Sequence, residues 1–124
     1  MTRAGLHDFC LSLPGTDSHF PFDEVTQLYR IRGKMFVLCD INAGAGGGPF
    51  TVNLKCDPGL AQELRREFAA DVRPGWHMNK THWNTVTING GLPDDKIEWL
   101  IQHSYDCVVA KLPKKPKPKA NASD

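Results

Sequence analysis

The sequence predicts an α+β domain in which an antiparallel sheet carries helices on one face. Apolar residues recur at spacings of three and four near both ends of the chain, which is the period of a helix with one buried side. Residues 50–57 instead alternate between apolar and polar side chains, which is the period of a strand with one buried face. Turn residues separate these segments in the order helix, three strands, helix, one or two strands and helix, which is typical of the α+β class.

Length and composition fit a single domain with its own core. The chain has 124 residues, of which 40% are hydrophobic and 23% charged, as in ordinary globular proteins. No apolar run is long enough to cross a bilayer, and the first residues form an amphipathic segment instead of the apolar core of a signal peptide. We therefore expect a cytoplasmic monomer that does not enter a membrane.

The first helix is predicted for residues 2–13. Leu6, Cys10 and Leu13 would lie on its buried side, and a Pro-Gly pair then ends it. Residues 16–24 are polar apart from a few embedded aromatic and proline residues, a composition that predicts a loop.

Two strands of a hairpin are predicted next. Residues 25–31 and 34–41 are rich in β-branched and large apolar residues and flank the turn pair Arg32-Gly33. The glycine-rich residues 42–49 then lead to the alternating strand. This glycine loop lacks the Lys-Ser/Thr pair of a phosphate-binding loop and precedes a strand, so it predicts a flexible connection only.

The second helix is predicted to start at Asp57-Pro58. Aspartate is a preferred N-cap, proline is favoured at the first helical position, and Leu60 and Leu64 would form the buried side. Residues 82–89 again predict a strand, followed by an Asn-Gly-Gly turn. In a regular strand Trp83 would lie on the open face of the sheet, whereas a bulge would turn it inward.

The last helix is predicted from the capping-box spacing of Asp95 and Glu98 and from an apolar side that continues to Leu112. The domain would thus cover residues 1–112. Residues 113–124 are a run of Lys and Pro followed by small polar residues, which predicts a disordered tail.

Residues 72–93 contain no Asp or Glu and concentrate groups that can bind a phosphate or stack on a base. These residues are Arg73, Trp76, His77, Asn79, Lys80, His82, Trp83 and Asn84. The segment therefore predicts a site for an anionic partner.

Each group also has a structural alternative. Asn79 and Asn84 could tie down a turn, and Trp83 could belong to the core. His77 and His82 are five residues apart, which does not bring them together as metal ligands in a strand or a helix, so we expect no metal.

A second cationic contact is possible around the first hairpin turn, where Arg30, Arg32 and Lys34 could act together with Lys55 on the polar face of the third strand. The alternative is a solvated sheet edge whose charges discourage aggregation. The balance of charge limits both sites: residues 1–110 carry 10 Lys and Arg against 13 Asp and Glu, whereas residues 111–124 carry 5 Lys and one Asp. Binding of a polyanion would therefore depend on a local patch, helped by the tail.

The four cysteines are Cys10, Cys39, Cys56 and Cys107. They are scattered through apolar segments without the paired spacing of a zinc site or a disulfide framework, so we expect reduced, buried thiols and no cofactor. The sequence also lacks the serine motif of hydrolases, and no catalytic constellation is predicted.

Three stretches of the chain resemble the MmcQ/YjbR family, also described as DUF419. They are VNLKCDP at residues 52–58, GWHMNKTHWNTV at residues 75–86, and GLPD at residues 91–94 leading into Ser104-Tyr105. The resemblance spans about residues 3–112.

The resemblance implies a two-layer fold of the CyaY-like or secretion-chaperone-like kind, with an antiparallel sheet of about five strands in the order α-β(3)-α-β(2)-α. It also implies a DNA-binding role attributed to a pair of hairpin wings. The chain departs from the family at Trp76, where tyrosine is more usual, and in the glycine-rich residues 44–48.

Two functional hypotheses follow. The first is a non-enzymatic DNA-binding protein that contacts phosphates through Arg73, Lys80 and neighbouring donors. The alternative is an adaptor for a small ligand or a protein, which would use the open sheet face with Lys55 and Trp83.

Overall fold

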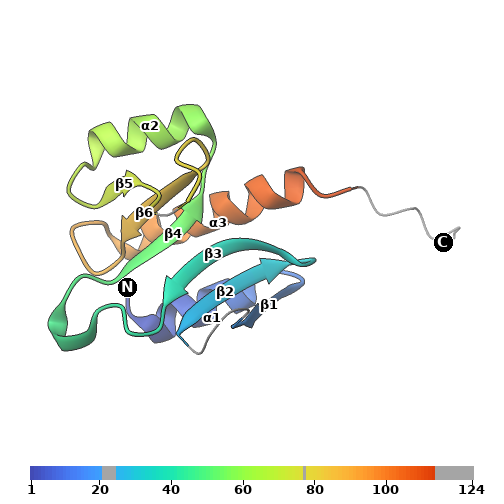
Figure 1. Ribbon diagram of the computed structural model, residues 1–124, viewed down its shortest axis with the longest axis horizontal. Coiled ribbons are helices and arrows are strands. Elements are labelled where there is room, and N and C mark those ends of the chain that lie inside the picture. The colour runs from blue at the N-terminus through green and yellow to red at the C-terminus, as the bar shows by residue number, and fades with distance from the viewer. Residues whose placement is uncertain (21–24, 77, 114–124) are drawn as a thin grey trace, which may run out of the picture.

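The computed structural model describes residues 1–20, 25–76 and 78–113. They form an α+β domain with an antiparallel sheet, as predicted (Figure 1). His77 and nearly all of the predicted tail lie outside the described residues. In chain order the elements are α1 (Arg3–Ser12), β1 (Thr16–His19), β2 (Thr26–Ile31), β3 (Lys34–Asp40), a short 3-10 helix η1 (Ala45–Gly47), β4 (Thr51–Lys55), α2 (Pro58–Glu67), β5 (Val72–Pro74), β6 (Trp83–Thr87) and α3 (Asp94–Ala110).

The described sheet has six strands in the order β1-β2-β3-β4-β6-β5, one more than the expected five. The additional strand is β1, which pairs with β2 from Thr16 opposite Ile31 to His19 opposite Leu28. The prediction of a loop throughout residues 16–24 was therefore wrong. A polar edge strand has no apolar alternation by which it could be recognised, and its backbone pairing decides the conformation instead.

The predicted hairpin is confirmed. Arg32 and Gly33 form the turn between β2 and β3, and both have positive φ angles, 51° and 81°, as a type I′ turn requires. The register shifts between Tyr29 and Arg30, which leaves Phe36 of β3 as the extra residue of a bulge. At this bulge the consecutive residues Phe36 and Val37 are both buried. The Phe36 ring meets the edge of the Tyr105 ring of α3, with the ring centroids 5.5 Å apart.

The second helix begins as predicted, because the Asp57 side chain accepts a hydrogen bond from the Leu60 N–H and Pro58 is the first helical residue. The capping box predicted from Asp95 and Glu98 is wrong. α3 begins at Asp94, its N-cap is Pro93, and no side chain caps it. Asp94 and Asp95 lie in the first turn, where carboxylates are favoured by the helix dipole.

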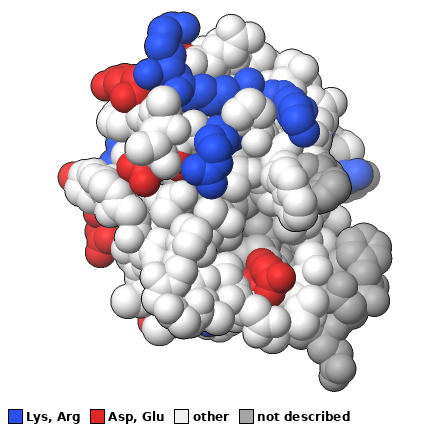
Figure 2. All heavy atoms as spheres, turned by 60° about the vertical axis from the view of Figure 1, so that its left-hand side comes forward, with Lys and Arg blue, Asp and Glu red and all other residues white. Residues whose placement is uncertain are grey.

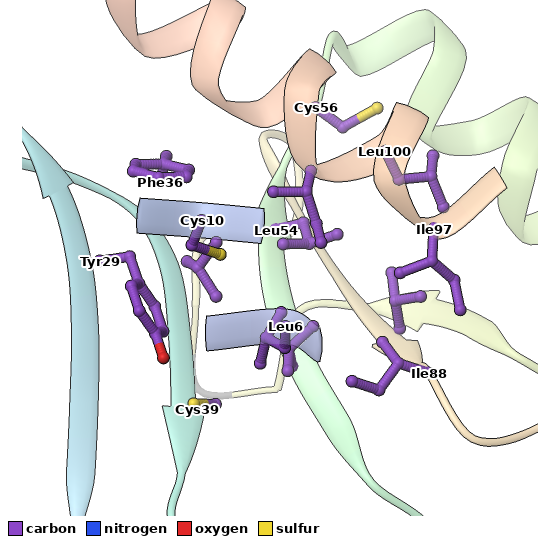
Figure 3. Packing of buried hydrophobic residues seen from close by; sticks show 14 of the residues in the cluster. Leu6, Cys10, Tyr29, Phe36, Cys39, Leu54, Cys56, Ile88, Ile97 and Leu100 are labelled. Carbon is purple, nitrogen blue, oxygen red and sulfur yellow. The ribbon is translucent and has the colours of Figure 1, made fainter. Parts of the chain in front are cut away.

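All three helices contribute to one core on one face of the sheet (Figure 3). Leu6 and Cys10 of α1 and Leu64 of α2 belong to it, together with a row of side chains from α3. The strands supply the side chains that alternate toward the helices. These are Tyr29, Ile31, Val37, Cys39, Val52, Leu54, Val72 and Val86. The opposite face of the sheet carries no helix and is available for a site (Figure 1).

One hydroxyl ties α3 to the sheet beside the bulge. The Ser104 side chain is fully buried, and its Oγ donates to the Phe36 carbonyl of β3 at 2.5 Å and accepts from the Lys55 N–H of β4 at 2.8 Å. It therefore bridges two strands where their pairing ends.

Replacing Ser104 by alanine should lower the free energy of unfolding by about 1–3 kcal/mol, because two backbone groups lose this partner in a buried site. Denaturant titration followed by circular dichroism measures the loss. The control is Ser12→Ala, whose exposed hydroxyl bonds to Phe9 at the end of α1 and should contribute less than about 0.5 kcal/mol. Equal losses in the two variants would contradict the role of the buried hydroxyl.

Candidate functional site

The open face, which is the sheet face opposite the helices, is polar where β4 meets β6. Thr51 and Asn53 of β4 stand opposite Thr87 and Thr85 of β6. Thr85 donates from its Oγ1 to the Asn53 Oδ1 at 2.7 Å, so these two side chains fix one another. Lys55 and Trp83 form the next pair along the two strands.

The β5–β6 loop, described for residues 75–76 and 78–82, folds back against this face. The Gly75 N–H donates to the Trp83 carbonyl at 2.9 Å, and the Trp76 N–H donates to Thr85 Oγ1 at 3.0 Å. Gly75 lies so close to β6 that a Cβ atom there would stand 2.8 Å from the Trp83 Cβ. A residue without a side chain is thus required for the loop to approach the strand.

Arg65 of α2 holds the other end of this loop. Its Nε donates to the Asn84 Oδ1 at 2.6 Å, and its Nη2 donates to the carbonyls of Lys80 and Trp83. The sequence analysis did not single out Arg65. Its one signal was the position directly after Leu64, at the border of the buried side of the helix.

Several predicted site residues have the structural role that was the alternative for them. The Asn79 Oδ1 accepts from the Thr81 N–H inside the loop, and Asn84 is 2% exposed and bonded to Arg65. Trp83 has the strand phase that was predicted, on the open face, yet it is only 7% exposed. The Gly75 backbone packs against it, and the Lys55 ammonium lies 6.0 Å from its ring centroid.

Three predicted residues remain exposed together at the edge of the open face. Trp76 is 71% exposed, and Arg73 of β5 and Lys80 of the loop are exposed beside it. They line a depression of about 500 Å³ to which β4 and β6 add polar side chains. Its lining residues are Thr51, Asn53, Arg73, Pro74, Trp76, Lys80 and Thr85.

The two cations of this depression keep donors for a ligand. The Lys80 Nζ donates to the Gly75 carbonyl at 3.0 Å, and an ammonium has two further N–H groups. Arg73 makes one long hydrogen bond, from Nη1 to the Ala70 carbonyl at 3.4 Å. Figure 2 shows Lys and Arg side chains gathered over the upper part of one side of the molecule, at the level of α2 in Figure 1, with acidic side chains near them.

Trp76 also borders a second depression of about 380 Å³ toward β2 and β3. Its lining residues are Thr26, Leu38, Cys39, Asp40, Asn42, Ala43, Pro49, Thr51, Asn53 and Trp76. It carries an acidic residue, Asp40, and no Lys or Arg, so the two sides of Trp76 differ in charge.

The remaining predicted residues lie apart from this cluster. Arg30 is on β2, which β3 and β4 separate from β6, and it forms a two-point ion pair with Asp17 at 2.8 and 3.2 Å. Hydrogen bonds from Arg30 lower the pKa of Asp17. Arg32 bonds to the Pro113 carbonyl, and half-buried His82 accepts at its carbonyl from the Cys56 N–H.

The cysteine thiols are held in their neutral form. Burial raises the pKa of Cys56 to about 12 and also raises the pKa of Cys10, Cys39 and Cys107. Among the described residues, no group of three or more His, Cys, Asp or Glu side chains is arranged to hold a metal ion. Within the same residues, no helix has the length and apolar character that a membrane span needs.

Comparison with known proteins places the chain in a family. The YjbR family model matches residues 11–107. This chain belongs to the YjbR family. Escherichia coli YjbR, described as uncharacterized, is 34% identical to it over 113 residues, which are 91% of this chain and 92% of the relative. Bacillus subtilis YyaQ is 35% identical over 115 residues, covering 85% of this chain and 96% of the relative.

Solved structures of similar proteins support the fold of this YjbR protein. The crystal structure of Deinococcus radiodurans DR2400, a DUF419 domain, matches with a TM-score of 0.80 at 34% identity, covering 88% of this chain and 80% of that chain. A solution structure from Pseudomonas syringae matches with a TM-score of 0.70 at 26% identity, covering 94% and 98%. The predicted family and the α+β fold are thus confirmed.

Replacing Arg65 by methionine should loosen the β5–β6 loop, because the apolar side chain keeps the length but loses every donor to Asn84 and the loop carbonyls. We expect a loss of about 1–3 kcal/mol in unfolding free energy, and faster hydrogen exchange at the Trp83 amide. Arg66→Met is the matched control, since Arg66 is exposed and makes no hydrogen bond or ion pair within the described residues. Hydrogen-exchange rates at the Trp83 amide that change equally in both variants would contradict the role of Arg65 in holding the loop.

Proposed function

We propose that this YjbR protein is a non-enzymatic DNA-binding protein that holds a single-stranded segment at the edge of the open face. The observation that carries the proposal is the position of Trp76, 71% exposed beside the exposed cations Arg73 and Lys80. An aromatic ring stacks on an unpaired base, while adjacent cations neutralise the phosphates on either side of it.

The loop geometry supports stacking because it fixes the backbone that carries the ring. The Trp76 N–H is bonded to Thr85, which is itself bonded to Asn53 of the next strand. A ring anchored in this way loses less freedom on binding than a ring on a mobile loop, and a preorganised contact gives more affinity.

The polar side chains that line the depression support contacts to sugar and phosphate groups. Thr51 has a hydroxyl there, and Lys80 retains two N–H donors. Such contacts position a nucleic-acid backbone without reading its sequence. Binding should therefore be weakly specific.

The overall charge argues for modest affinity. Residues 1–110 have three more acidic than basic residues, so long-range attraction of a polyanion is weak and the local cations must supply it. The lysines after residue 110 can add affinity that does not depend on sequence.

An adaptor for a small ligand or a protein is the second candidate. It is favoured by the depression on the other side of Trp76, which contains Asp40 and no cation and is thus poorly suited to phosphate. Such a partner would bind across both depressions with little dependence on salt.

Fluorescence anisotropy with labelled single- and double-stranded oligonucleotides tests the proposal. We expect the single strand to bind more tightly, with log K falling linearly with log salt. Lys80→Ala should make this slope shallower by about one unit, and Trp76→Leu should weaken binding by about 1–3 kcal/mol. Lys96→Ala and Trp99→Leu on α3 are the matched controls and should leave binding unchanged.

The contribution of the tail is separated by a full-length variant in which its lysines become glutamine. The substituted residues are Lys114, Lys115, Lys117 and Lys119. If this variant no longer binds DNA while Trp76→Leu binds as tightly as the unsubstituted protein, the tail alone attracts DNA and the proposed site is overturned. Binding that ignores salt would favour the adaptor.

A further inference from the structure

Three lysines converge at the end of the sheet where β3 begins and where β4 and α3 end. They are Lys34, Lys55 and Lys111, and they line a pocket of about 430 Å³, a size typical of small-molecule sites. The other lining residues are Met35, Trp83, Val108, Leu112 and Pro113. The pocket therefore combines a cationic part with an apolar part that includes an indole ring.

None of these three lysines forms an ion pair with a carboxylate among the described residues. The ion pairs among the described residues join the Met1 ammonium to Asp94 and Arg30 to Asp17, so neither includes a lysine of the pocket. Like charges that share a pocket repel one another. A bound anion relieves that repulsion, whereas a cation or a neutral molecule does not.

The frame of the pocket is fixed before any ligand binds. The Lys55 N–H donates to the buried Ser104 hydroxyl, which attaches the end of β4 to α3. On the opposite side Arg32, in the left-handed conformation that the hairpin turn requires, donates from Nη2 to the Pro113 carbonyl at 3.3 Å. The hairpin thus holds the chain that leaves α3 against the rim.

The pocket is separate from the depression around Trp76. On β6, Trp83 lines the lysine pocket and Thr85 lines the depression around Trp76. The Gly75 backbone of the β5–β6 loop packs against Trp83, so the loop lies between the two hollows. Arg73, Trp76 and Lys80 line the first hollow and none of them lines this pocket.

We propose that the lysine pocket binds a phosphomonoester carried by a flat ring, of the size of a mononucleotide. The phosphate would be held by the ammonium groups of Lys34, Lys55 and Lys111, which act as point charges with several donors each. The ring would lie against the apolar part of the lining, chiefly the partly exposed Met35 and Leu112, with Trp83, which is 7% exposed, next to them. The phosphomonoester belongs either to a free nucleotide or to the 5′ end of a strand, and the site goes beyond the proposed function because it does not use Trp76.

Tryptophan fluorescence of the full-length chain gives a direct readout. The protein has three tryptophans, so the double variant Trp76→Phe, Trp99→Phe leaves Trp83 as the single reporter inside the pocket. Titration with adenosine 5′-monophosphate should give a saturable change, confirmed by calorimetry on the unsubstituted protein. Adenosine without phosphate should bind far more weakly.

Charge-removing variants test which lysines hold the phosphate. Lys55→Gln and Lys111→Gln should each weaken binding of the nucleotide by about three- to tenfold. The control Lys96→Gln, on α3 and outside the pocket, should not change the affinity for the nucleotide. Melting temperatures of the variants identify any that are misfolded, and the Lys111→Gln variant keeps the test valid if Lys55→Gln unfolds.

The source of the phosphate is distinguished by oligonucleotides with and without a 5′-phosphate, in the same double variant. Tighter binding of the phosphorylated oligonucleotide than of the mononucleotide would assign the site to strand ends, and the reverse would assign it to free nucleotides. Trp76→Leu should leave mononucleotide binding intact, so failure of the proposed DNA site is recognised independently. Equal binding of adenosine and its monophosphate, equal effects of the pocket and control lysines, or no binding at all would overturn the proposal.

Discussion

The Arg65 guanidinium connects the parts on which the open face depends. It comes from a helix on the core side, reaches past the end of β6, and bonds both to Asn84 and to carbonyls of the β5–β6 loop. Because a planar guanidinium has five donors in fixed directions on three nitrogen atoms, it can bond acceptors that lie apart, whereas the three donors of lysine all leave one atom. This contact between layers therefore holds one end of the loop that covers Trp83 with Gly75 and carries Trp76.

The two faces of the sheet are stabilised in different ways. The helix-covered face is held by apolar packing of three helices, with one buried hydroxyl between α3 and the bulged strands. The open face is held by side-chain hydrogen bonds such as that from Thr85 to Asn53, and by a loop that crosses it. Burial therefore determines the fold, whereas polar contacts determine which groups of the open face reach solvent.

Much of the fold was predictable because local signals agreed with the global arrangement. The alternation of residues 50–57, the aspartate and proline before α2, and the turn at Arg32 and Gly33 each have a direct structural cause. β1 was missed because its residues are polar and its conformation comes from backbone pairing with the next strand, β2. The start of α3 was misassigned because proline, and not an acidic side chain, precedes the helix.

The candidate site was predictable as a segment but not as a surface. The acid-free residues 72–93 include the β5–β6 loop, and Trp76, Arg73 and Lys80 are exposed together there. Composition could not show that the Asn79 and Asn84 side chains bond within the protein, since an amide serves a turn and a ligand equally well. The lysine pocket was foreseen in part, because Lys34 and Lys55 were grouped around the first hairpin turn, whereas Lys111 joins them only through the tertiary structure.

The edges of the sheet have a consequence for how a partner can approach. β5 has three residues and ends in Pro74, which has no N–H to offer, and β1 is a short strand that includes Asp17. Neither edge gives an incoming peptide a long row of backbone groups with which to extend the sheet. Recognition by β-augmentation is therefore disfavoured, and a partner must instead lie across the strands, where side chains and not backbone groups make the contacts.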